Sequence, residues 1–165
     1  MHDAANNLLY AALIGAGATA LTDLFVLARK WVAGIALPDY TPVGRWLAHM
    51  THGQFHHHAI AAAPRVHGER AIGWTAHYLT GIAFAYVLLA IWGVEWVRHP
   101  ALGPALIIGF GSVAAPLLLM QPGMGAGIAA RHTTHPNIAR LRSIVMHGVF
   151  GVGLYAAGCA VSWMR

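Results

Sequence analysis

Three ionisable residues lie inside long apolar stretches of the sequence. They are Asp23, His77 and His147. An ionisable side chain in such a stretch is costly to bury, so its presence favours a functional role. Imidazole and carboxylate groups are the usual ligands of zinc, iron, manganese and copper, and two histidines with one carboxylate form the triad of many non-haem iron enzymes. These residue types are therefore sufficient to hold a transition-metal ion.

The three groups also share one depth, measured from the basic residue that ends each stretch. The separations are six residues from Asp23 to Arg29, seven from Arg70 to His77, and five from Arg142 to His147. At 1.5 Å of rise per residue, all three lie ~7–11 Å inside the same boundary. Small residues flank them at helical spacing, among them Thr19, Gly73, Gly81 and Gly151. Because small residues allow membrane helices to pack closely, these faces are expected to meet in the protein interior.

Further candidate ligands lie between the first two apolar stretches. We expect His49, His57 and Glu69 to close the metal site from this segment. The run from His52 to His57 also has the spacing of one histidine box of the membrane di-iron desaturases and hydroxylases, which it weakly resembles. A solvated histidine run is the alternative for His56–His58, and the sequence does not decide whether this run is functional.

Other uses of the same residues stay open. His77 and His147 on separate helices are the pair that a bis-histidine haem requires. An Asp/His relay suits an ion-coupled or proton-coupled transporter, which with so few helices needs a homo-oligomer. The three groups also suit polar interhelical hydrogen bonds without any chemistry. The sequence therefore assigns no catalytic residue and leaves open whether the protein is an enzyme acting on a lipid-soluble small molecule.

The elements that position these residues follow from composition. Of 165 residues, 58% are hydrophobic and 9% are charged, whereas soluble domains carry about 25% charged residues. Four apolar stretches cover about residues 8–31, 71–96, 101–121 and 140–164, and each is near the ~20 residues that span a bilayer. We predict an all-α, integral membrane four-helix bundle that forms a single domain over residues 1–165.

A short amphipathic helix is predicted between the first two membrane helices, within about residues 42–63. Its apolar residues Val43, Trp46, Leu47 and Met50 recur at helical spacing, and a tryptophan suits the membrane interface. In the third stretch, Pro116 predicts a kink. The run from Gly123 to Gly127 predicts a flexible helix exit, because it lacks the preceding strand and the Lys-Ser/Thr of a phosphate loop.

Basic residues predict the orientation. Eight of the ten lysines and arginines flank or fill the two larger loops, against Arg98 and Arg165 elsewhere. Since cytoplasmic loops are enriched in Lys and Arg, we expect both termini to be periplasmic. The basic residues form no stripe or tail, which argues against nucleic acid as a partner. The single cysteine, Cys159, excludes an internal disulfide.

Several short segments resemble one known family. They are Gly44-Arg45-Trp46, Gly53-Gln-Phe55, Gly68-Glu69-Arg70, Gly73-Trp74, His77-Tyr78, Gln121-Pro-Gly-Met-Gly-Ala-Gly127 and His147 to Tyr155. On these residues the chain resembles the small bacterial four-helix membrane proteins grouped as domain of unknown function 2938. The resemblance covers almost the whole chain and implies a bacterial inner-membrane protein of this topology. It transfers no catalytic or ligand residues.

Overall fold

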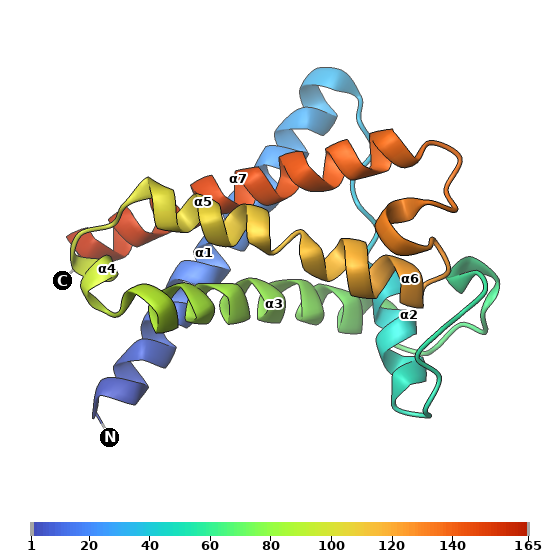
Figure 1. Cartoon of the computed structure of the whole chain (residues 1–165), viewed down its shortest axis with the longest axis horizontal. Helices are drawn as coiled ribbons and strands as arrows, with labels where there is room; N and C mark the ends of the chain where they lie inside the picture. The colour runs from blue at the N-terminus through green and yellow to red at the C-terminus, as the bar shows by residue number, and fades with distance from the viewer. Residues whose placement is uncertain (1, 165) are drawn as a thin grey trace. The chain divides into compact units, whose positions relative to one another are not determined.

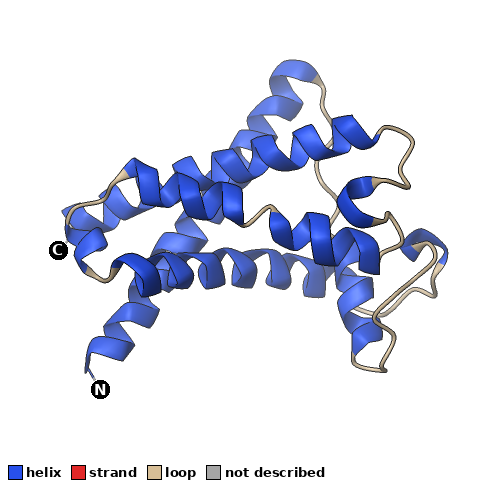
Figure 2. Ribbon diagram, viewed as in Figure 1, coloured by secondary structure: helices blue, strands red, loops and turns tan. Residues whose placement is uncertain are grey.

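The computed structural model describes residues 2–164, and its long elements are all helical (Figure 1). They are α1 (His2–Ala33), α3 (Glu69–Trp92), α5 (Leu102–Gly111) and α7 (Pro136–Trp163). The short elements are α2 (Thr41–Met50), η1 (Ile60–Ala62), α4 (Glu95–Arg98), η2 (Pro116–Met120), α6 (Gln121–Gly123) and η3 (Ile128–Ala130). Figure 2 draws no strand among these residues. The all-α prediction and the short helix between the first two long helices are confirmed.

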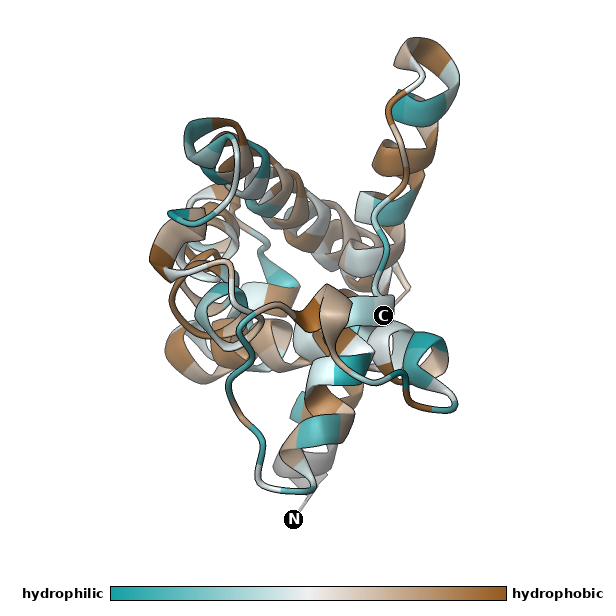
Figure 3. Ribbon diagram, turned by 90° about the vertical axis from the view of Figure 1, so that its right-hand side faces the viewer, coloured by the Kyte–Doolittle hydropathy of each residue, from teal (hydrophilic) through white to brown (hydrophobic). Residues whose placement is uncertain are grey.

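Four helical segments are long and apolar enough to cross a membrane. They are Asn6–Ala33, Glu69–Trp92, Leu102–Gly123 and Pro136–Trp163. Large apolar side chains on all four are open to the surroundings, including Leu24 (60% exposed), Leu79 (59%), Ile107 (61%) and Leu141 (62%). Hydrophobic colours accordingly recur along the long helices in Figure 3. Such surfaces are unfavourable in water and suit contact with lipid.

The residues group into two compact units, which we describe separately. The first unit contains the residues up to Leu37, Tyr78–Ser112, and those from Met146 onward. The second contains Pro38–His77 and Val113–Val145. Long helices contribute segments to both units. The first unit holds a hydrophobic core in which Ile14, Leu88, Val97 and Leu154 are almost fully buried.

Glycines let the helices of the first unit touch backbone to backbone. A Cβ added to Gly15 of α1 would meet the backbone of Ile82 in α3, and one added to Gly81 would meet the Thr19 hydroxyl. Thr19 is 1% exposed, and its hydroxyl donates to the carbonyl oxygen of Gly15 at 2.8 Å. The faces of small residues that were predicted near Asp23 and His77 thus contact each other between α1 and α3.

Helices α5 and α7 approach one another in the same way. A Cβ at Gly109 would lie 2.5 Å from the Cα of Gly151 and 2.7 Å from the carbonyl oxygen of His147. This contact brings the polar residues near the end of α5 next to the middle of α7. Because of this contact, His147 lies close enough to the end of α5 to have a hydrogen-bond partner there.

Two helix interruptions have clear local causes. The kink expected at Pro116 is present: the chain turns at Ser112 and Val113 and continues as the π-helix η2, because proline has no N–H for the regular helical bond. The second apolar stretch ends earlier than expected, at Trp92. Gly93 adopts φ +74°, which ends α3, and α4 forms a separate turn.

Candidate functional site

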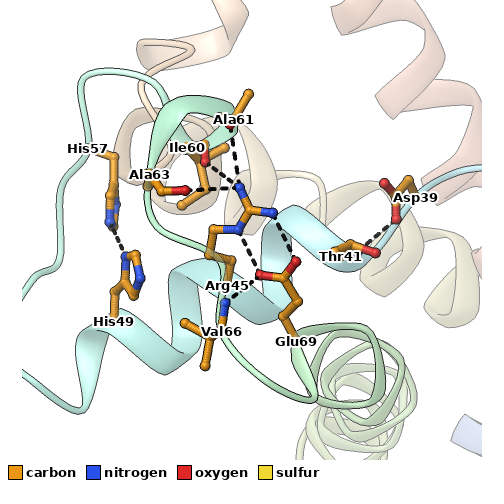
Figure 4. A network of polar contacts seen from close by, with 10 residues as sticks. All are labelled: Asp39, Thr41, Arg45, His49, His57, Ile60, Ala61, Ala63, Val66 and Glu69. Carbon is orange, nitrogen blue, oxygen red and sulfur yellow. Dashed lines mark hydrogen bonds and ion pairs between the residues drawn. The ribbon is translucent and has the colours of Figure 1, made fainter.

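Arg45 and Glu69 form the polar anchor of the second unit (Figure 4). Arg45 Nε lies 2.7 Å from Glu69 Oε2 and Nη2 lies 2.9 Å from Oε1, with the side chains 9% and 12% exposed. Arg45 Nη1 also donates to the carbonyl oxygen of Ile60 at 3.0 Å. Hydrogen bonds to Glu69 raise the pKa of Arg45 above its ordinary value. The Glu69 carboxylate, expected as a metal ligand, is held here by a guanidinium.

His49 and His57, two other expected ligands, do come together (Figure 4). His49 Nδ1 lies 2.7 Å from His57 Nε2, and the two rings stack with centroids 4.9 Å apart. His57 is only 4% exposed, and its Nδ1 is buried without a hydrogen-bond partner among the described side chains, those of residues 6–164. A neutral imidazole has one N–H and one lone pair, so the close pair shares a single proton between two nitrogens.

The glycine-rich segment after α6 supports the histidine loop. His57 N–H donates to the carbonyl oxygen of Gly123 at 2.8 Å, and Ile60 N–H donates to that of Met124 at 3.1 Å. Gly125 has φ +94°, and a Cβ there would meet the carbonyl of His58. The sequence indicated a flexible helix exit at this segment. In the structure this segment also packs closely against the histidine loop. The glycines at alternate positions are the feature of the sequence that indicates this close packing.

Beside His57 lies an open groove of ≈ 850 Å³. One wall is the segment from His56 to Ala61, and the other runs from Pro122 through the glycine-rich segment to His132. A Cβ on Gly127 would lie 2.8 Å from Cγ of Arg131 and 2.9 Å from Cγ of His132, so the glycine makes room for both side chains. Arg131 Nε donates to His132 Nε2 at 3.1 Å. No pattern in the sequence predicted this groove.

Asp23 and His147 both lie in the first unit and both have hydroxyl partners. The Tyr78 hydroxyl of α3 donates to Asp23 Oδ2 of α1 at 3.0 Å. His147 Nδ1 lies 2.7 Å from Ser112 Oγ, whose proton goes to the carbonyl oxygen of Gly109 at 2.6 Å. His147 Nδ1 therefore donates, and its Nε2 carries the lone pair in the neutral ring.

His77 belongs to the second unit and lies in an aromatic environment. Its ring stacks on Tyr40 with centroids 4.2 Å apart, and its Nε2 lies 3.2 Å from the Tyr40 hydroxyl. The edge of Trp74 completes the contact, with centroids 5.9 Å apart. A common centre for Asp23, His77 and His147 stays a prediction. Among the side chains of residues 6–164, no group of three or more His, Cys, Asp or Glu has the spacing of a metal site.

These features define a multi-pass α-helical membrane protein with polar pairs inside its apolar helices and a histidine pair on its connecting segment. A family model described as "Protein of unknown function (DUF2938)" matches residues 12–161. The chain belongs to this family, as its sequence motifs indicated. No curated protein and no solved structure matches the chain.

Proposed function

We propose that this membrane protein binds a transition-metal ion through His49 and His57. The observation that supports this is the 2.7 Å separation of His49 Nδ1 and His57 Nε2 at a nearly buried position. Two Zn–N bonds of about 2.0–2.1 Å at a tetrahedral angle need nitrogens about 3.3 Å apart. A shift of about half an ångström in either ring would therefore let a metal ion replace the proton between the two nitrogens.

The ligand set differs from the one expected from sequence. Glu69 is paired with Arg45, which leaves two imidazoles as the protein ligands at this position. Two nitrogens leave coordination positions open for water or for an oxygen of a substrate, unlike the closed shells of structural zinc sites. The proposed site is thus suited to reversible binding of zinc, iron, manganese or copper at the cytoplasmic face of a bacterial inner membrane. A lipid-soluble small molecule is the proposed substrate class if this centre is catalytic.

Competition titrations with a chromophoric chelator test the proposal. The protein is purified in detergent without a histidine tag and titrated with zinc. We expect His49→Ala and His57→Ala to weaken zinc binding at least about tenfold, because each removes one of two protein ligands. His52→Ala is the matched control, since this exposed imidazole lies on the same segment and bonds Thr51 and the Ala48 carbonyl. Equal zinc affinities in all three variants would contradict the proposed site.

A second candidate is a structural role for the intramembrane polar residues. The observation that favours it is a hydroxyl partner for Asp23 and for His147 in the first unit. Tyr78→Phe and Ser112→Ala should each lower stability in detergent by about 1 kcal/mol while zinc binding is unchanged. The haem alternative uses His77 and His147, and a visible absorption spectrum of the purified protein tests it.

A further inference from the structure

The groove beside His57 has a lining rich in side chains that can donate hydrogen bonds. It includes the guanidinium of Arg131 and the imidazoles of His56, His57, His58 and His132. None of its lining residues, all within the described part of the chain, is Asp or Glu. We propose that this groove binds a phosphate-type anion, either a phosphate monoester or inorganic phosphate.

Arg131 supplies the charge for this site. Its hydrogen bond to His132 uses Nε, and its two terminal nitrogens have no hydrogen-bond partner in the part of the chain whose side chains are described, residues 6–164. Arg45 and Arg140 of the same unit are instead tied to protein acceptors, namely Glu69 and the Ala129 carbonyl. A guanidinium with free terminal N–H groups matches the paired oxygens of a phosphate.

His57 supplies a donor from the opposite wall. Its Nε2 faces His49, so Nδ1 carries the N–H when His49 donates to Nε2. This Nδ1 is buried and lacks a partner among the described residues. An unpaired buried donor is unfavourable, and a small rotation of the ring toward the groove would let an anion oxygen satisfy it.

The geometry of the walls favours phosphate over carboxylate. Donors come from both sides, with His57 and His58 on one loop and Arg131 on the other. A carboxylate presents two oxygens in one plane, whereas a phosphoryl group presents three in a pyramid, which suits donors that come from two walls. The site goes beyond the proposed metal centre, because the anion would contact Arg131 and His57 Nδ1, whereas the metal would bind His49 Nδ1 and His57 Nε2.

The test measures binding of two probes by the full-length protein. Inorganic phosphate is titrated calorimetrically into protein in an uncharged detergent, and phosphatidic acid is added in native mass spectrometry with phosphatidylcholine as the comparison lipid. Binding of phosphate alone identifies a soluble anion as the ligand, and selective binding of phosphatidic acid identifies a lipid headgroup. Both results support the proposal. Failure of the wild type to bind either probe overturns it.

Variants assign the binding to the groove. Arg131→Ala should weaken binding at least about tenfold, because it removes the only guanidinium in the lining. Ile128→Glu, at a 53% exposed lining position, places a carboxylate in the groove and should also weaken binding. Arg142→Ala removes an exposed arginine outside the lining and should leave binding unchanged. Equal losses of binding in Arg131→Ala and Arg142→Ala would show that the overall positive charge attracts the anion, and would overturn the site.

The same variants separate this proposal from metal binding. His49→Ala should lose zinc affinity and keep most of its phosphate affinity, because Arg131 still supplies the charge, whereas Arg131→Ala should lose phosphate affinity and keep zinc binding. A phosphate affinity that falls in His49→Ala as much as in Arg131→Ala would place the anion on the histidine pair and contradict a separate groove site.

Discussion

Arg45 carries the largest set of polar contacts in the second unit. It binds both oxygens of Glu69 and the carbonyl of Ile60, and it is 7% exposed. Only a guanidinium has enough donors in one plane for this arrangement. Glu69 begins α3, and Ile60 lies in the segment that carries His57, so one side chain joins three parts of the chain.

Arg45→Lys should therefore lower the thermal unfolding midpoint in detergent, by about 5 °C or more, because an ammonium cannot bind both carboxylate oxygens and the carbonyl together. Arg65→Lys provides the control at an exposed arginine of the same unit. If both variants unfold at the temperature of the wild type, the arginine is not the anchor that its contacts indicate.

The sequence predicted which residues lie in polar clusters better than it predicted their hydrogen-bond partners. His49 and His57 were expected in one site and lie together. Glu69 was expected in the same site, but its partner is Arg45, 24 residues earlier in the chain. Tyr78 stood out in the sequence only as part of a family motif, yet its hydroxyl donates to Asp23 on another helix. Such pairs depend on which helix faces meet, and hydrophobic periodicity does not specify them.

The helices themselves follow closely from the sequence. Runs of apolar residues predicted the four long segments, and Pro116 predicted the interruption in the third. The end of α3 at Trp92 was less predictable. It depends on the left-handed conformation of Gly93, and a lone glycine in an apolar run does not reveal its φ angle.

The crossing of α1 and α3 depends on Gly15. A Cβ there would collide with the backbone of Ile82, which cannot move aside as a flexible side chain can. Gly15→Ala should destabilise the protein by about 1–3 kcal/mol, because the helices must separate. The measurement is thermal or denaturant unfolding in detergent.

Gly111→Ala is the matched control for this crossing. An added Cβ at Gly111 of α5 meets nothing within 4 Å. Because alanine favours helix over glycine by up to ~1 kcal/mol, this variant should be neutral or stabilising. Equal destabilisation in both variants would show that helix propensity, and not close packing, governs these positions.

At the scale of the whole molecule, the orientation in the membrane is a prediction from charge. Eight basic residues flank or fill the larger loops and two lie elsewhere. In a Cys159→Ala background, Gln54→Cys should be protected from a membrane-impermeant maleimide in intact spheroplasts, and His99→Cys should be labelled. Both positions are exposed outside the long helices. Labelling of position 54 and protection of position 99 would show that the protein has the opposite orientation.

Fold class and family were both predictable for the molecule as a whole, because low charge and four apolar runs leave few alternatives for a chain of 165 residues. The function stays a proposal. The site proposed from depth alone combines Asp23, His77 and His147, whereas the contacts favour His49 and His57 on the connecting segment. Depth along a helix gives one coordinate, and a binding site also requires the rotation of each helix and the path of its loops.

The metal content of the purified protein decides whether His49 and His57 bind a transition-metal ion. Untagged wild type, His57→Ala and Asp23→Ala are purified without chelating resin, washed with a mild chelator, and analysed for zinc, iron, manganese and copper. The proposal predicts about one bound metal ion per wild-type chain, loss of that ion in His57→Ala and retention in Asp23→Ala. Loss in Asp23→Ala with retention in His57→Ala would move the site to the intramembrane layer. A well-folded wild type without metal would contradict metal binding altogether.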